Sequence, residues 1–279
     1  MSITLHNVNI GAITIGQGAP LALIAGPCVL ESRDLAFHVA EYVCALTAQL
    51  GMPFIFKGSF DKANRTSIAA FRGPGLYEGL QILADVRQQF AVPVCTDFHE
   101  PEQAQELARV VDLLQVPAFL CRQTDMLLAA AETGKPVSVK KGQFLAPWDM
   151  KNVVDKFTAG GNQQLLLTER GASFGYNNLI VDMRSLAVMR EYGYPVIFDA
   201  THSAQLPGGA GAATGGQREF IPAMVRGAVA VGVDALFMEV HPDPAQGLSD
   251  ATTMWPLAEL RAVLEMAQRI DVVGGRIEP

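Results

Sequence analysis

The sequence predicts a closed (β/α)8 TIM barrel, an α/β fold in which eight parallel strands are surrounded by helices. Short apolar runs alternate with longer amphipathic segments along the chain, and this alternation is typical of parallel strands that are buried on both faces and separated by helices. Eight such units follow one another without a low-complexity linker, which favours a closed barrel over an open doubly wound sheet. We therefore predict a single barrel domain over residues 1–279.

Each predicted unit pairs one short apolar run with one helix-length segment. The predicted strands are 21–25, 53–57, 92–96, 113–116, 137–140, 165–168, 196–199 and 235–240. The predicted helices are 35–50, 75–90, 102–111, 124–133, 150–160, 178–192, 217–231 and 257–270. Before the first unit, two β-like segments at 3–9 and 12–15, joined near Gly11, predict an N-terminal hairpin within residues 1–17 that closes the bottom of the barrel.

Composition excludes several classes of function. The chain has 279 residues, 49% of them hydrophobic, which is enough for one large core. A net charge of −7 argues against nucleic-acid binding. The start lacks a signal-peptide pattern and no apolar stretch could span a membrane, so we expect a cytoplasmic protein with no membrane partner. The four cysteines are widely spaced, which disfavours both a disulfide framework and a redox regulator.

Polar residues gather at the ends of the predicted strands. In a barrel of this kind the loops after the strands converge on one face, so side chains placed there can meet. Any one of them could simply be a solvated strand end, but together they predict a functional site at this face. They are Lys57, Asp97, Gln115, Lys140, Arg170, His202 and Glu239.

Four side chains at or after strand ends form a candidate metal site: Cys28, His202, Glu239 and Asp250. Taken singly, each has a plain structural explanation, such as a small core thiol or a satisfied histidine. Taken together, one thiolate, one imidazole and two carboxylates suit a divalent ion such as Zn, Fe, Mn, Co or Cd. We therefore predict a divalent metal ion as cofactor.

The segment 57–67 concentrates three cations, an amide and several hydroxyls in one loop. This mixture suits recognition of phosphate or carboxylate groups, although a solvated polar loop is the alternative. Lys140, Lys141 and Arg170 add cations at two further strand ends, so we expect the site to hold more than one anionic group. Lys57 and Lys140 would lie close enough to lower the pKa of one of them, which would favour proton transfer.

The glycine-rich segment 208–216 lacks the lysine of a phosphate-binding P-loop and does not follow the first strand of a dinucleotide-binding unit. Its position soon after His202 and its glycine content predict instead a mobile lid that closes over the site.

Seven segments carry a resemblance to a known family, namely 26–32, 57–67, 72–75, 115–120, 140–144, 170–171 and 239–244. On these segments the chain resembles, over almost its whole length, the 3-deoxy-D-manno-octulosonate 8-phosphate synthases, also called 2-dehydro-3-deoxyphosphooctonate aldolases. The resemblance implies a transferase on a barrel, usually a homotetramer, that condenses phosphoenolpyruvate with D-arabinose 5-phosphate and water and releases inorganic phosphate. The product serves lipopolysaccharide biosynthesis as the precursor of Kdo.

Three features refine this resemblance. Lys62-Ala63-Asn64-Arg65 differs from the Lys-Pro-Arg-Thr typical of sister synthases that use erythrose 4-phosphate. Cys28 points to the metal-requiring group of the family, because metal-independent members have Asn there, and Gly142 agrees with that group. Ala251 departs from the glycine that is common after the aspartate at position 250.

The resemblance also implies roles for individual residues. Phosphoenolpyruvate would be held by Lys57, Ser59, Lys140 and Arg170, with Gln115 and Ala118 lining the pocket. The sugar phosphate would be held by Lys62, Asn64, Arg65 and Thr66. Asp97 and Gln143 would support these groups, and Arg122 would reach a neighbouring subunit's site. The predicted catalytic residues are Lys140, His202, Asp250 and Lys62.

Three alternatives stay open from the sequence. They are the sister synthase that uses erythrose 4-phosphate, a sialic-acid-type synthase, and a sugar-phosphate-binding protein that has kept the barrel without the chemistry.

Overall fold

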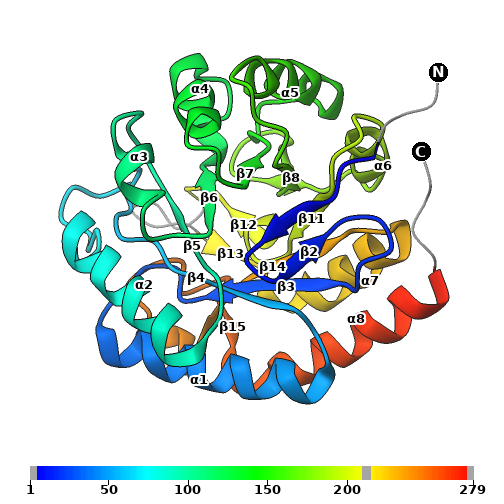
Figure 1. Cartoon of the computed structure of the whole chain (residues 1–279). Helices are drawn as coiled ribbons and strands as arrows, with labels where there is room; N and C mark the ends of the chain where they lie inside the picture. Colours follow the sequence, from blue (N-terminus) through cyan, green and yellow to red (C-terminus); the bar gives the residue numbers. More distant parts are fainter. Residues whose placement is uncertain (1–4, 209–214, 275–279) are drawn as a thin grey trace.

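A computed structural model, which describes residues 5–208 and 215–274, shows a closed barrel of parallel strands (Figure 1). Its eight strands follow one another around the ring in chain order, and pairing of the last strand with the first closes it. This confirms the predicted fold and all eight predicted strands. They are β3 (Ala22–Gly26), β4 (Phe54–Lys57), β5 (Val94–Asp97), β6 (Leu113–Val116), β7 (Val137–Lys140), β8 (Leu165–Glu169), β11 (Val196–Asp199) and β14 (Ala235–His241).

Helices surround the strands on the outside of the ring (Figure 1). They are α1 (Arg33–Leu50), α2 (Leu76–Phe90), α3 (Gln103–Leu107), α4 (Thr124–Glu132), α5 (Met150–Ala159), α6 (Arg184–Arg190), α7 (Ile221–Val231) and α8 (Leu260–Gly274). The sequence sets their ends: α1 begins where the Ser32 hydroxyl accepts the Leu35 N–H, and it ends at Gly51 in the left-handed conformation. None of the helices described combines the length and apolar character needed to cross a membrane.

Several short elements decorate the barrel. Two two-stranded pairs follow β8 and β11, namely β9 (Ala172–Ser173) with β10 (Leu179–Ile180) and β12 (Gln205–Leu206) with β13 (Gly215–Gly216). β15 (Trp255–Pro256) adds to β14. The 3-10 turns are Ala118–Leu120, Pro147–Asp149, His202–Ala204, Arg218–Phe220, Pro244–Gln246 and Leu257–Glu259.

The predicted helix over 178–192 is wrong in its first half. Leu179 and Ile180 form β10, which pairs with Ala172 and Ser173, and the helix starts only at Arg184. The Asp182 side chain accepts the Arg184 N–H at 3.0 Å, which forms an Asx-type turn just before the helix. The predicted helix over 102–111 is also shorter, because α3 ends at Leu107 and the chain turns towards β6.

The N-terminal hairpin closes the bottom of the barrel, as predicted. Its strands are β1 (Val8–Ile10) and β2 (Ile13–Ile15), connected through Gly11 with φ of 60°. The prediction placed the first strand at 3–9, of which residues 3 and 4 lie outside the described part. Fully buried apolar side chains of the hairpin pack onto residues of the barrel interior, and together they form one apolar cluster: Val8, Ile10, Ile15, Ala22, Ile24, Ile55, Cys95, Leu113, Leu166, Ile197, Ala235 and Phe237.

Two buried aspartates tie strands together at the bottom of the barrel. Asp234, just before β14, accepts the Val196 N–H at 2.7 Å and pairs with Arg190 at 2.9 Å. Asp112, just before β6, similarly accepts the Val94 N–H at 3.0 Å, and it pairs with Arg87 at 3.0 Å. Each carboxylate therefore accepts the N–H group at the start of a strand and also pairs with an arginine of a helix. Both lie at the bottom of the barrel, opposite the face where the strands finish.

We expect Asp234→Ala to lower the free energy of unfolding by about 3–5 kcal/mol, because removing one member of a buried ion pair leaves Arg190 without its charged partner. Urea denaturation would measure the loss. The matched control is Asp155→Ala, which removes an exposed partner of Lys151 and should leave stability almost unchanged. Equal effects of the two substitutions would contradict this account.

Candidate functional site

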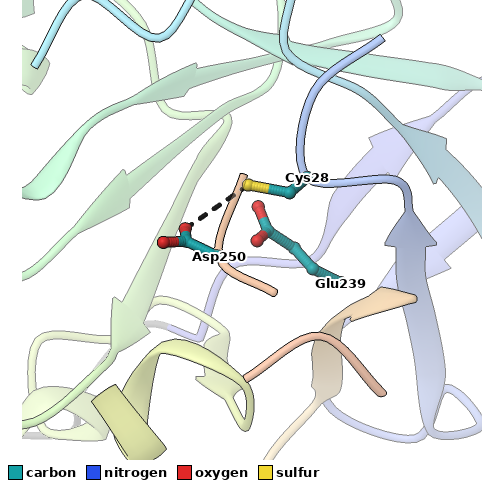
Figure 2. Close-up of side chains that lie close together, drawn as sticks. All are labelled: Cys28, Glu239 and Asp250. Atoms are coloured by element: carbon teal, nitrogen blue, oxygen red, sulfur yellow. Dashed lines mark hydrogen bonds between the residues drawn. The ribbon is translucent and has the colours of Figure 1, made fainter. Parts of the chain in front are cut away.

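Three of the four predicted metal ligands lie together at the barrel mouth, the end where the strands finish (Figure 2). Cys28 follows β3, Glu239 lies in β14, and Asp250 lies in the loop after β14. One ligand atom from each lies within 4.8 Å of the others, and the Cys28 Sγ is 3.3 Å from the Asp250 Oδ2. Residues more than two hundred positions apart therefore meet because β3 and β14 are neighbouring strands.

His202 lies beside this cluster. Its Nε2 is 3.7 Å from both the Glu239 Oε2 and the Asp250 Oδ2. Its Nδ1 is 2.8 Å from the Asp199 Oδ2, and its backbone N–H donates to the Asp199 Oδ1 at 2.9 Å. With Nδ1 directed at a carboxylate, Nε2 is the ring nitrogen that faces the cluster, an arrangement common among metal-bound histidines.

The donor set fits a divalent metal ion. Glu239 Oε2 is buried and has no hydrogen-bond partner within the described residues, and a bare buried carboxylate oxygen is costly unless a cation meets it. Burial, followed by repulsion from Glu239, raises the pKa of Cys28 well above its usual range. The thiol therefore keeps its proton in the absence of a metal and can donate it to Asp250.

Asp250 reaches the cluster from an unusual backbone conformation. Its φ is +45°, in the left-handed region that aspartate and asparagine enter more readily than most side chains. The loop that carries it is held by the preceding Ser249 and Leu248, which accept hydrogen bonds from Arg65 at 2.8 and 2.7 Å. Arg65, predicted to bind the sugar phosphate, is therefore also an anchor of the loop that presents Asp250.

Two lysines, buried Lys57 and partly buried Lys62, share the other oxygen of Glu239. The Nζ atoms of Lys57 and Lys62 lie 3.4 and 3.6 Å from Glu239 Oε1. Lys57 also donates to Ser59 Oγ at 2.7 Å and lies 3.6 Å from Asp97. Burial opposes ionisation of Glu239, yet attraction to the surrounding cations keeps its pKa well below the usual range. The carboxylate therefore stays charged and joins the cation cluster to the candidate metal ligands.

Lys140 occupies the centre of a second polar group. Its Nζ lies 2.5 Å from Asp199 Oδ2, 3.5 Å from His202 Nδ1 and 3.6 Å above the Phe237 ring. Burial lowers the pKa of Lys140, and repulsion from Lys57 adds to this against the attraction of Asp199. The predicted direction is therefore confirmed, although burial is the larger cause.

Several buried polar atoms at strand ends lack a hydrogen-bond partner within the described residues. They include Asp97 Oδ1, Gln143 Oε1 and Arg170 Nη1, whereas Arg170 Nη2 donates to Gln205 at 2.6 Å. Gln115, at the third residue of β6, is also buried. Buried polar groups are normally paired, so these atoms mark places where a polar ligand would replace missing bonds.

The other predicted binding residues are less enclosed. Asn64 and Thr66 are exposed in the loop after β4, whereas Lys62 points inward. Ala118 lies in the turn after β6 and is half-buried, and Arg122 follows it on the surface. Their predicted contacts with substrate and with a neighbouring subunit remain predictions. The predicted lid over 208–216 falls mainly on residues 209–214, which lie outside the described part.

Sequence reasoning missed three polar residues of the site. Asp199 holds both Lys140 and His202. His99 Nε2 lies 3.3 Å from the Asp97 Oδ2, and Glu169 contacts Lys141 and the turn after β8. Asp199 and Glu169 each close a barrel strand, as the predicted site residues do, so position alone gave a signal for both.

A TIM barrel whose mouth gathers buried cations beside a cluster of candidate metal ligands is typical of a barrel enzyme that acts on anionic substrates. Residues 2–273 match the model of the DAHP synthetase I family, and the chain belongs to this family.

The curated relatives narrow the group within that family. A protein of Trichlorobacter lovleyi is 60% identical over 266 residues, covering 95% of this chain and 98% of the relative. A protein of Methylococcus capsulatus is 60% identical over 257 residues, covering 92% and 91%. A Synechococcus protein is 59% identical over 268 residues, covering 96% and 94%. All three are named 2-dehydro-3-deoxyphosphooctonate aldolase, which confirms the resemblance inferred from the sequence.

Proposed function

We propose that this protein condenses phosphoenolpyruvate with D-arabinose 5-phosphate and water to give 3-deoxy-D-manno-octulosonate 8-phosphate and inorganic phosphate. The observation that carries the proposal is the meeting of Lys57, Lys62 and Lys140 with the candidate metal ligands at one end of the barrel. The names of the relatives support the same activity over the sister reaction with erythrose 4-phosphate.

The reaction needs two anionic reactants in a fixed mutual orientation. C3 of the enol forms a bond to the aldehyde carbon, the oxygen of water adds to C2, and the C2–O bond to phosphate then breaks. In our proposal Lys57, Ser59, Lys140 and Arg170 hold phosphoenolpyruvate, beside Gln115, Ala118 and Gln143, while Lys62, Asn64, Arg65 and Thr66 hold the sugar phosphate. Holding both reactants removes much of the entropic cost of a bimolecular encounter.

Lys140 is our proposed proton donor to the alkoxide that develops from the aldehyde. Asp199 keeps the ammonium in place at 2.5 Å and also holds His202, so the donor and the imidazole have a fixed spacing. Lys62 adds positive charge beside the aldehyde, and Asp97 supports this group of cations through its contact with Lys57. His202 and Asp250 orient water. A divalent ion held by Cys28, His202, Glu239 and Asp250 would supply Lewis-acid polarisation.

A phosphate-release assay with alternative aldehydes tests the substrate. With phosphoenolpyruvate present, we expect turnover with arabinose 5-phosphate and at least about tenfold lower kcat/KM with erythrose 4-phosphate, since a pocket that binds additional hydroxyls loses those contacts with the shorter sugar. Preference for erythrose 4-phosphate would establish the sister reaction, and use of N-acetylmannosamine the sialic-acid type. Binding of both substrates without turnover would indicate the non-catalytic alternative.

Chelation tests the metal. We expect chelator treatment to abolish turnover and added divalent metal to restore it, whereas full activity after removal of all metal would overturn the metal assignment. Cys28→Ala should lower the affinity for Zn²⁺ measured by calorimetry by more than about tenfold, because losing a ligand should cost at least as much as losing a partner that only orients one. The matched control is Cys44→Ala, a half-buried thiol on α1 outside the cluster, which should bind Zn²⁺ like the wild type.

We further propose that the enzyme is a cytoplasmic homotetramer in which Arg122 enters a neighbouring subunit's site. The support is the exposure of Arg122 and of Phe119, 52% exposed, in the loop after β6, together with the family resemblance. Light scattering at several protein concentrations would measure the assembly.

A further inference from the structure

We propose that Glu169 is a positioning residue for the phosphoenolpyruvate subsite. Its buried carboxylate fixes the turn that carries Arg170 and links that turn to the segment that carries Lys140. This inference rests on the proposed function, because it assigns Glu169 to the half of the site that would bind the three-carbon reactant.

Glu169 is the last residue of β8, and it is 1% exposed. Its Oε1 accepts the backbone N–H groups of Gly171 at 2.7 Å and Arg170 at 3.1 Å. Its Oε2 accepts the Ser185 hydroxyl of α6 at 2.7 Å. A single side chain thus holds both N–H groups of the turn that directs Arg170 and connects this turn to a helix outside the barrel.

The same carboxylate joins two neighbouring strands at the mouth. Lys141 Nζ lies 3.5 Å from Glu169 Oε1 and donates to the Leu145 carbonyl at 3.3 Å. Lys141 is 1% exposed and its backbone N–H donates to Thr168 in β8 at 2.8 Å. Because Lys141 follows Lys140 directly, the pair fixes the distance between the cations that end β7 and β8.

The backbone of the turn after β8 is tightly constrained. Gly171 has φ of +92°, a conformation that side chains rarely adopt, and its N–H is bound by Glu169. Arg170 then enters the mouth with Nη2 on Gln205 and with Nη1 buried and lacking a partner in the described residues. A guanidinium set to bind an anion in a fork needs its backbone held in this way.

Position separates this role from general support of the fold. Removing Glu169 would leave buried Lys141 without its charged partner and so lower stability, but Glu169 lies at the mouth, and the bottom of the barrel has its own carboxylate anchors. Among the described residues, the hydrogen bonds and the ion pair of Glu169 go to Arg170, Gly171, Ser185 and Lys141, and none goes to the loop 57–67 that would hold the sugar phosphate. Loss of the carboxylate should therefore affect one reactant far more than the other.

The experiment compares Glu169→Ala and Glu169→Gln with the wild type, by steady-state kinetics and by calorimetric binding of phosphoenolpyruvate. We expect Glu169→Ala to raise KM and Kd for phosphoenolpyruvate by at least about tenfold, with KM for arabinose 5-phosphate changed less than about twofold. Glu169→Gln should raise KM and Kd for phosphoenolpyruvate by a smaller factor than Glu169→Ala, because its amide oxygen can still accept the two N–H groups of the turn.

The matched control is Asp112→Asn, a buried carboxylate that also accepts a strand N–H and pairs with a cation, but at the bottom of the barrel. It should lower the thermal midpoint without changing the Kd for phosphoenolpyruvate. If Glu169→Gln leaves that Kd unchanged, or raises both KM values equally, the positioning role is overturned. If Glu169→Ala does not fold, the Kd and KM values of Glu169→Gln alone test the positioning role.

Binding and turnover separate this inference from the proposed function. Wild-type protein that binds phosphoenolpyruvate without condensing it would overturn the proposed function, while weaker binding by Glu169→Gln would still support the positioning role. Wild-type protein that fails to bind phosphoenolpyruvate would overturn both.

Discussion

Replacing Gly26 by alanine is expected to remove metal binding and condensation together. A Cβ at this position would lie 1.9 Å from the Lys57 carbonyl oxygen and 2.9 Å from its carbonyl carbon, so the backbone of β4 would have to move. Gly26 pairs with Glu239 in β14, and Cys28 follows two residues later. The added methyl group would thus displace a predicted substrate cation relative to two predicted metal ligands.

A displacement of about 1 Å at such a site can lower the rate by about 10²-fold, and we expect Gly26→Ala to lose at least this much kcat/KM. Calorimetric Zn²⁺ binding and phosphate release would be measured on the same preparation. The matched control is Gly274→Ala, where a Cβ would meet nothing nearer than 3.7 Å. Wild-type Zn²⁺ affinity in Gly26→Ala would show that the mouth tolerates this shift and would contradict the prediction.

Lys140→Met is expected to reduce kcat by about 10²–10⁴-fold, the range typical of removing a positioned proton donor. A lysine donates only while protonated, so turnover that depends on it falls as the pH rises through its pKa. Burial lowers that pKa from the ordinary lysine value, and the alkaline limb of the wild-type profile should lie correspondingly lower.

The pH profile distinguishes proton donation from simple loss of substrate binding. In Lys140→Met the remaining activity should lack the alkaline limb, whereas Lys151→Met, which changes an exposed lysine on α5, should retain the wild-type profile. A Lys140→Met enzyme that loses activity but keeps the same limb would assign the proton to another group.

The strands were predictable because each is a short run of side chains buried on both faces, a pattern that few other elements share. The helix predicted around Leu179 and Ile180 was wrong because the local pattern of apolar residues fits a helix as well as a strand. Only pairing with Ala172 and Ser173, which the local sequence does not encode, decides for a strand. Tertiary contacts there override the local pattern.

The gathering of candidate site residues was predictable where a residue type is unusual at or just after a strand end, as for Cys28, Lys57 and Lys140. Supporting carboxylates gave a weaker signal, because an aspartate or glutamate that ends a strand is commonly just solvated. Asp199 and Glu169 acquire their roles only through partners on other strands, Lys140 and Lys141, so three-dimensional placement was needed to find them.

The aspartates at the bottom of the barrel precede β6 and β14, which lie four strands apart around the ring. The strands whose N–H groups they accept, β5 and β11, also share a sequence motif. It is Pro-Val-x-x-Asp, from Pro93 to Asp97 and from Pro195 to Asp199. Each of these terminal aspartates pairs with one lysine and one histidine, namely Lys57 with His99 and Lys140 with His202. The motif thus recurs four strands apart around the ring, but the lysines do not follow the repeat, because Lys57 ends β4 and Lys140 ends β7, three strands further along. Of the two histidines, His202 is the one whose Nε2 faces the candidate metal ligands.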